Sequence, residues 1–204
     1  MGMIRAACLF LALPALAGAE PGYFRVTGVA QDDVLNLRAA PSAQAEDLGD
    51  LDPDTRHVEV IGFDDSGDWA RIARGERDLW AAARFLVPDQ PDTLETSSLP
   101  DGLSCSGTEP FWSLTLSSSA ARFDAPGSPP LALDISDVTI AEGRIGSPAR
   151  VTLTGTDARA EAHVFGALCS DGMSDRSYGW TALVGLQHGA ERRLLSGCCT
   201  FLPD

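Results

Sequence analysis

The chain has 204 residues, of which 44% are hydrophobic and 22% charged, so it holds enough apolar material for one or two globular domains. Its 29 acidic residues outnumber its 15 basic residues, all of them arginine, and the formal net charge is −14. Because phosphate backbones and anionic membrane surfaces repel such a chain, nucleic acid is excluded as an expected partner.

The first 19 residues have the pattern of a secretory signal peptide. A single basic residue, Arg5, precedes an apolar run over residues 6–17, and Ala17-Gly-Ala19 resembles a cleavage site. The run is shorter than the roughly 20 apolar residues that a membrane span needs, and Pro14 interrupts it. We therefore predict cleavage after Ala19, no stable membrane insertion afterwards, and a periplasmic or secreted mature protein.

Residues 20–88 are predicted to form a small β-domain. Val58-Glu-Val60 alternates apolar and polar positions, as a strand does when one face packs on a core and the other meets water. Turn-forming residues stand on either side of the predicted strands, at Asp52-Pro-Asp54 and Asp64-Asp-Ser-Gly67. Only residues 78–86 are expected to include a helical turn.

Five separated pieces of this region follow one another in a recognisable order. They are Val34-Leu-Asn36-Leu-Arg38-Ala-Ala-Pro41-Ser42, Leu48 to Val60 with its Asp-Pro-Asp turn, Trp69-Ala-Arg71-Ile72, Leu79-Trp80-Ala81 and Arg84-Phe85-Leu86. Together they resemble a bacterial SH3-type domain over residues 23–87. The resemblance implies a small SH3-like barrel that binds cell-wall peptides or other short extended peptides, or that docks on another domain of its own chain. Asp78-Leu79 replaces the family's usual glycine, and Ala81 its valine, so the last strand is expected to be distorted.

Three residues of this region are candidate ligand contacts: Asn36, Arg38 and Trp80. An aromatic groove on a small barrel suits an extended peptide, and Arg38 could pair with a peptide carboxylate. Each residue also has a structural interpretation. Asn36 would hold a turn through its amide, Arg38 would pair with an internal acid, and Trp80, like Trp69, would pack in the core.

Residues 89–102 are rich in Pro, Asp and Ser and carry no periodic apolar pattern, which is typical of a linker that buries no core. Residues 103–204 again read as strands. Apolar residues alternate at Trp112, Leu114 and Leu116, and at every second position from Trp180 to Leu186, with a hairpin tip at His188-Gly189. We therefore predict an all-β fold, with a small SH3-like barrel followed by a disulfide-stabilised antiparallel barrel or sandwich.

Four cysteines remain after signal-peptide cleavage: Cys105, Cys169, Cys198 and Cys199. An even number in an exported chain indicates disulfides. A direct bond between the adjacent pair would be strained, so each of the two is expected to reach one of the other cysteines, in an order that the residues leave open. Their spacing does not suit zinc, and no metal or cofactor is expected.

Three segments of this second region form a specific signature, each with a cysteine: Cys105-Ser-Gly107-Thr-Glu109-Pro-Phe-Trp112, Cys169-Ser-Asp171-Gly-Met-Ser174-Asp175-Arg176, and Gly197-Cys-Cys199. They resemble an uncharacterised family of bacterial envelope proteins, often lipoproteins, whose members carry further small β-domains of a kind that includes lysozyme inhibitors. The family has no established activity to transfer. This chain has no lipobox, so membrane tethering does not transfer either.

Disulfides would bring the polar residues of this signature to one end of the domain. The candidate ligand site there comprises Glu109, Trp112, Asp171, Ser174, Asp175, Arg176 and Tyr178, with Trp112 or Tyr178 as a stacking face. The structural alternative is that Glu109 caps backbone N–H groups, that Asp171-Gly172 forms a turn, and that Asp175 and Arg176 anchor the loop.

These features favour a non-catalytic binding or interaction protein of the cell envelope, whose partner is a cell-wall peptide or another envelope protein. A first alternative is an inhibitor of cationic cell-wall hydrolases, because uniform negative charge would speed the encounter with a basic enzyme. A second is a hydrolase that uses Glu109 and Asp171 as a carboxylate pair or Ser174 as a nucleophile. The chain has no catalytic sequence motif of the common hydrolase classes, and we predict that it is not an enzyme.

Overall fold

The computed structural model describes residues 21–201, and the predicted signal peptide lies outside them. The regular secondary structure of these residues is β-strand, apart from one 3-10 turn, and loops and turns connect the strands. The first seven strands are β1 (Gly22–Val26), β2 (Leu35–Arg38), β3 (Asp47–Leu51), β4 (Val58–Phe63), β5 (Trp69–Arg74), β6 (Arg77–Ala82) and β7 (Leu86–Pro88), with the turn η1 (Ala83–Phe85) before β7. The other eight are β8 (Leu103–Thr108), β9 (Phe111–Ser117), β10 (Ala120–Asp124), β11 (Leu131–Ile140), β12 (Ala149–Thr154), β13 (Ala158–Ser170), β14 (Ser177–His188) and β15 (Glu191–Phe201). The predicted all-β class is confirmed.

The first seven strands make one antiparallel sheet, called here the N-terminal sheet. Its strand order is β3-β2-β6-β5-β4-β1-β7. Turns form where the sequence predicts them, after β3 at residues 52–54 and after β4 at residues 64–67. The sheet encloses a core of mostly aliphatic side chains: Val26, Leu35, Leu37, Leu51, Val58, Val60, Ala70, Ile72, Leu79, Ala81 and Leu86.

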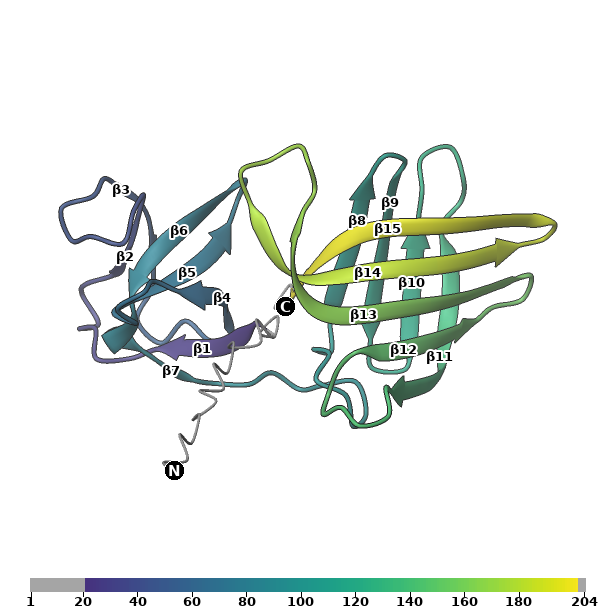
Figure 1. Ribbon diagram of the computed structural model, residues 1–204, viewed down its shortest axis with the longest axis horizontal. Coiled ribbons are helices and arrows are strands. Elements are labelled where there is room, and N and C mark those ends of the chain that lie inside the picture. Colours follow the sequence, from purple (N-terminus) through teal and green to yellow (C-terminus); the bar gives the residue numbers. More distant parts are fainter. Residues whose placement is uncertain (1–20, 202–204) are drawn as a thin grey trace, which may run out of the picture.

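The last eight strands form a closed barrel, called here the C-terminal barrel. Each strand pairs with its neighbour in the chain, and β15 pairs with β8 to close the ring. Closure leaves no exposed sheet edge, so every backbone row is paired. The alternative left open by the sequence, a sandwich, is therefore wrong. Figure 1 shows the N-terminal sheet beside this barrel, with β13, β14 and β15 as its longest strands.

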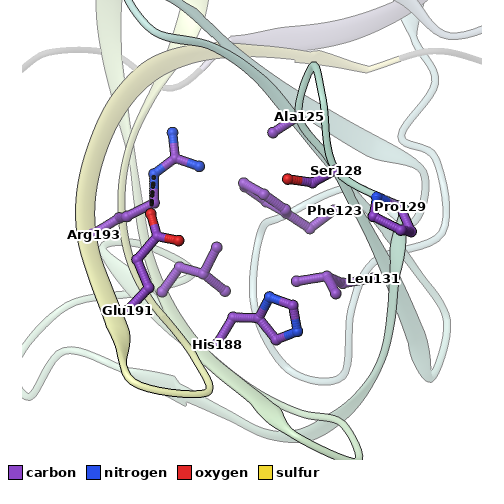
Figure 2. A pocket seen from close by; sticks show the side chains of 9 residues that line it. Phe123, Ala125, Ser128, Pro129, Leu131, His188, Glu191 and Arg193 are labelled. Atoms are coloured by element: carbon purple, nitrogen blue, oxygen red, sulfur yellow. Dashed lines mark ion pairs between the residues drawn. The ribbon is translucent and has the colours of Figure 1, made fainter.

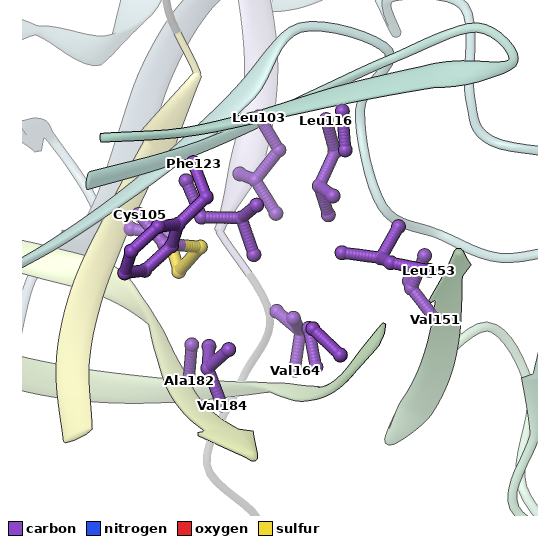
Figure 3. Packing of buried hydrophobic residues seen from close by; sticks show 14 of the residues in the cluster. Leu103, Cys105, Leu116, Phe123, Val151, Leu153, Val164, Ala182 and Val184 are labelled. Carbon is purple, nitrogen blue, oxygen red and sulfur yellow. A yellow bond between two sulfur atoms is a disulfide. The ribbon is translucent and has the colours of Figure 1, made fainter. Parts of the chain in front are cut away.

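The barrel interior is filled by the alternating residues that the sequence identified. Trp112, Leu114 and Leu116 on β9, and the residues of β14 from Trp180 to Leu186 in steps of two, are all buried. In Figure 3, side chains of opposite walls point toward one another, among them Leu103, Val164 and Val184. This barrel is a packed core and not a pore.

The segment between the two parts differs from the sequence-based expectation of a linker that buries nothing. Leu94 and Leu99 are 1% and 0% exposed and belong to the barrel core. A tight loop holds them there, because the Leu94 N–H donates to the Leu99 carbonyl at 2.9 Å and Thr93 bridges Pro100. Two isolated leucines escape a search for periodicity, yet together with backbone hydrogen bonds such as that from the Ser98 N–H to the Gly146 carbonyl they hold the segment against the barrel.

Two disulfides join the four predicted cysteines. Cys105 bonds Cys199, and Cys169 bonds Cys198. The adjacent cysteines thus reach two partners, as predicted. Within residues 21–201, no helix has the length and hydropathy that a membrane span requires.

Candidate functional site

Trp80 lies on an outer face of the N-terminal sheet, between two arginines. It is in register with Arg38 on β2 and with Arg71 on β5, so the three side chains form one row across the strands. The indole is half-buried, and its remaining surface is open to solvent. This row of an aromatic ring between two guanidinium groups is called here the Trp80 face.

Asn36 and Arg38 support the loop beside this face. The Asn36 amide donates to the Asp47 carboxylate, and Arg38 Nη1 donates to the Ala45 carbonyl at 3.1 Å. Arg38 Nη1 also lies 4.0 Å from the Asp47 carboxylate. The turn-holding role of Asn36 and the internal acidic partner of Arg38 are thus both present. The structure brings Asn36, Arg38 and Trp80 together on one face of the sheet, and contact with a ligand stays a prediction.

In the C-terminal barrel, the loop between β13 and β14 is organised around Asp171. One carboxylate oxygen accepts the backbone N–H groups of Met173 and Ser174, each at 3.0 Å, and the other accepts the Tyr178 hydroxyl at 3.1 Å. The Ser174 hydroxyl donates to the same carboxylate. The N–H donors, led by that of Met173, hold the pKa of Asp171 below its usual range. A general acid needs the opposite shift, so this carboxylate is suited to holding a loop.

The rest of that loop contacts the N-terminal sheet. The backbone of Asp175 forms an isolated parallel β-bridge with that of Arg77 at the start of β6, and the Ser177 N–H donates to the Asp78 carboxylate at 2.8 Å. Asp78 also accepts from Arg71 and from the Ser177 hydroxyl, so it ties the Trp80 face to the barrel. Figure 1 shows the loop beside the tips of β5 and β6. Ser174, Asp175 and Arg176 were expected at a ligand site, but the structure places this part of the loop at a junction between the two parts of the chain.

A hydrogen-bonded chain crosses the same junction deeper in the molecule. Arg176 Nη2 donates to the Thr200 hydroxyl at 2.9 Å, and Thr200 donates to Glu59 Oε2 at 2.6 Å. The Phe201 N–H donates to the same oxygen at 3.1 Å, while Glu59 Oε1 is buried without a partner among the described residues. Burial raises the pKa of Glu59, against the hydrogen bonds and the charge of Arg176.

Aromatic contacts surround this chain. Trp180 Nε1, inside the barrel, donates to the Tyr23 hydroxyl of β1 at 3.0 Å, and the Tyr23 ring meets Phe201 edge-on. Gly179 makes room for the contact, because a Cβ there would stand 2.7 Å from Pro21 and 3.1 Å from Glu59 Oε1. The N-terminal sheet and the barrel are therefore packed on each other through buried, specific contacts, called here the junction.

Trp112 lies in the barrel core and not on the surface. It is 4% exposed and stacks on Phe123, with ring centroids 6.2 Å apart. Gly107 and Gly197 give it space, since a Cβ would stand 2.2 Å from Trp112 Nε1 at the first position and 2.7 Å from its Cζ2 at the second. Of the two residues expected as a stacking face, Trp112 is thus out of reach of a surface ligand, whereas Tyr178 is partly exposed. Both glycines of the cysteine signature serve the packing of Trp112.

Glu109 and Asp171 do share a groove, on the outside of the barrel. It has a volume of about 310 Å³ and lies between the β8–β9 turn and the β13–β14 loop. The Cys169–Cys198 disulfide lies in its wall, and Met173, 69% exposed, stands at its rim. The Thr108 hydroxyl holds the two walls together by donating to the Asp171 carbonyl at 2.9 Å. The Glu109 carboxylate has no hydrogen bond or ion pair with the described residues, so the expected capping role is not seen.

A second, smaller cavity lies at the far mouth of the barrel. Figure 2 shows Phe123, Leu131, His188, Glu191 and Arg193 around it, with an ion pair between the last two at 3.8 Å. Its volume of about 30 Å³ is of the size that one water molecule occupies. Residues 21–201 contain no group of three His, Cys, Asp or Glu side chains placed to hold a metal ion.

Sequence reasoning missed the residues of the N-terminal sheet that form the junction. Glu59 stands in an alternating segment, where a polar residue is expected to face water. Its side chain is instead 9% exposed, because the barrel covers that face of β4. Asp78 stands out in the sequence only as a departure from a family pattern, and no sequence signal pairs it with Ser177, 99 positions away. No protein-family model, curated protein or solved structure matches the chain.

Proposed function

We propose that this protein is a non-catalytic binding protein of the bacterial cell envelope, whose Trp80 face receives a short extended peptide of the cell wall. The observation that carries the proposal is the cross-strand row of Arg38, Trp80 and Arg71. The half-buried indole of Trp80 offers an apolar surface to an extended peptide. The guanidinium groups on either side of the indole can pair with carboxylates of that peptide.

Export to the envelope belongs to the same proposal. The two disulfides support it, because such bonds persist in oxidising compartments. The basic and apolar start of the chain supports it as well. The resemblance of residues 23–87 to SH3-type domains supplies the ligand class, since such modules bind wall peptides.

The junction supports the binding role of the Trp80 face in a physical way. Asp78 holds Arg71 from one side and accepts hydrogen bonds from Ser177 on the other, so the barrel restrains one of the two arginines. Asp47 and the Ala45 carbonyl restrain Arg38 in the same manner. Side chains held in place before binding lose less conformational entropy when a peptide arrives.

A sedimentation assay with purified sacculi tests the proposal. The mature chain is expected to sediment with the sacculi, and Trp80→Ala to reduce the bound fraction at least fivefold. Phe63→Ala is the matched control, because Phe63 is an exposed aromatic residue of β4, outside the Trp80 face. Circular dichroism of each variant checks folding, and Trp80→Tyr, which keeps an aromatic ring in the row, is expected to retain at least half of the binding. Absence of the native chain from the pellet, or equal losses in the Trp80→Ala and Phe63→Ala variants, contradicts the proposal.

One observation favours a second function, inhibition of cationic cell-wall hydrolases. The groove on the barrel presents the unpartnered carboxylate of Glu109 beside the exposed Met173, in a protein of formal charge −14. A cationic side chain of an enzyme would find both a charge partner and an apolar contact there.

Lysozyme turnover at low salt, with a molar excess of the protein, tests this second function. Inhibition that weakens with added salt and in the Glu109→Gln variant supports it, because surface attraction between charges is screened by salt. Unchanged turnover at low salt removes it.

A further inference from the structure

The outward face of strands β13, β14 and β15 carries a row of polar residues at the end of the barrel far from the junction. Arg159 on β13 is in register with Gln187 on β14, and Gln187 is in register with Arg192 on β15. Neighbouring strands are about 4.8 Å apart, so the Cα atoms of the two arginines lie about 10 Å from each other. Both side chains are exposed.

These arginines differ from those around them in having no partner. Arg150 pairs with Asp137 at 3.4 Å, and Arg193 pairs with Glu191 at 3.8 Å. Neither Arg159 nor Arg192 makes a hydrogen bond or ion pair with the described residues. Two arginines without partners thus lie in one row of a protein whose formal net charge is −14.

Apolar surface adjoins this cationic row. Leu194 is 78% exposed and Leu183 is 40% exposed, both on the outward face of the same strands. Gly185 is in register with Leu194, and a Cβ at this glycine would meet only the Glu161 carbonyl, at 4.0 Å. The strands here border an open groove of about 750 Å³, whose lining includes Arg159, Gly185, Gln187 and Arg192, together with one exposed carboxylate, Glu161, which lies 4.0 Å from His163.

We propose that this face is a docking surface for a protein segment that presents apolar side chains flanked by carboxylates. Two unpaired guanidinium groups with an amide between them complement carboxylates, and guanidinium binds carboxylate through paired hydrogen bonds. Leu183 and Leu194, with the open space above Gly185, can contact the apolar side chains of the segment. Exposed apolar patches of this kind mark sites of protein–protein contact. An anionic membrane is the less suitable occupant, because its extended surface meets the net charge of the whole chain, whereas a short segment contacts the two arginines locally and the more distant charges are screened by salt.

Fluorescence anisotropy with a defined probe tests the proposal on the full mature chain. The probe is a fluorescein-labelled peptide, Gly-Glu-Glu-Leu-Gly-Leu-Glu-Glu, and its two controls replace every Glu by Gln or every Leu by Ser. The native chain is expected to bind the probe at least tenfold more tightly than either control peptide, with an affinity that falls as salt is added.

Three further measurements determine whether this surface is the site. The double variant Arg159→Gln/Arg192→Gln is expected to bind the probe at least tenfold more weakly, and Leu183→Ser/Leu194→Ser at least threefold. The matched control, Arg25→Gln/Arg144→Gln, removes the same charge from exposed positions elsewhere and should bind as the native chain does.

Equal binding by the two arginine double variants, or no binding of the probe at millimolar protein, overturns the proposal. Flotation with vesicles of anionic phospholipid that depends on Arg159 and Arg192 would assign the face to a membrane and overturn it as well. The last alternative is that a second copy of this chain occupies the face, and sedimentation equilibrium tests it. If the native chain is a dimer and the Arg159→Gln/Arg192→Gln variant is a monomer, the occupant is a second copy and the proposal is overturned.

Discussion

The Thr200 hydroxyl donates a 2.6 Å hydrogen bond to the Glu59 carboxylate, joining the last strand of the barrel to the fourth strand of the N-terminal sheet across 141 positions of sequence. Arg176 donates to the same hydroxyl, so a charged side chain of the signature loop is linked to a buried acid of the other part of the molecule. The contact gives Asp175, Arg176 and their neighbours a structural role, since they hold the two parts in a fixed relation.

The buried Glu59 predicts a specific dependence of stability on pH. Its pKa is raised in the folded protein, so the folded state binds more protons than the unfolded state once the pH exceeds the ordinary value of about 4.5. The contribution of Glu59 to stability is therefore greatest below that pH and is lost as the pH rises through the raised pKa. We expect the stability difference between the native chain and Glu59→Gln to shift in favour of the variant across this window.

Urea denaturation of both proteins between pH 4 and pH 8 measures the effect. The comparison uses the difference between the two proteins because other carboxylates, such as Asp89 and Asp171, have lowered pKa values and also change the absolute stability with pH. A difference that stays constant across the series would show that Glu59 does not titrate as inferred.

Loss of the Tyr23 hydroxyl is predicted to destabilise the junction. Tyr23→Phe leaves the Trp180 indole N–H buried without this acceptor, which costs about 1–3 kcal/mol. Tyr178→Phe is the control, because Asp171 keeps its backbone donors when the Tyr178 hydroxyl is removed, and we expect a loss below about 1 kcal/mol. Free energies of unfolding from denaturant titration report both values. A smaller loss for Tyr23→Phe than for Tyr178→Phe contradicts the role given to this contact.

The glycine at the end of the signature is predicted to be required for barrel packing. In Gly197→Ala, the new Cβ would stand 2.2 Å from the Ser106 carbonyl oxygen and 2.7 Å from Trp112, so backbone has to move. Overpacking of this kind costs about 1–3 kcal/mol. At Gly62, by contrast, a Cβ meets nothing within 4 Å, and Gly62→Ala should change stability by about 0.5 kcal/mol or less. Thermal unfolding of the two variants tests the difference, and similar melting temperatures would contradict it.

The two disulfides are predicted to differ in their resistance to reduction. Cys105 and Cys199 are 0% exposed within the barrel core, whereas Cys169 is partly exposed on the wall of the outer groove. Exposed disulfides react first with added thiols. Under native conditions, limiting dithiothreitol followed by alkylation and mass spectrometry should therefore label Cys169 and Cys198 before the other pair. Simultaneous labelling of all four cysteines would indicate that the barrel opens before either bond is cut.

The strands of the barrel were largely predictable from local sequence. Residues 180–186 alternate in steps of two, and their inward members are buried as expected. Such alternation is a local signal, because successive side chains of a strand point to opposite faces whatever the strand packs on. The turns at Asp52–Asp54 and at His188-Gly189 follow from local backbone preferences in the same way.

The candidate site was predictable only in part. The sequence placed Asn36, Arg38 and Trp80 in one small domain, and the strand register then set Trp80 directly between Arg38 and Arg71. It also singled out the β13–β14 loop, but it could not show that this loop packs on Asp78 and Gly75 of the N-terminal sheet. A contact between residues 99 positions apart depends on how the surfaces of the two folded parts pack together, and local sequence patterns do not encode it.

The adjacent cysteines show which features the sequence determined and which depended on the tertiary structure. Because a direct bond between adjacent cysteines would be strained, the sequence by itself predicted that Cys198 and Cys199 reach different partners. Closure of the barrel then set Cys199 directly opposite Cys105 in the core, and left Cys198 on the outer wall to bond Cys169. The local pattern thus determined the strands and their two faces, whereas the register of distant strands decided the disulfides, the burial of Glu59 and the side chains that meet at the junction.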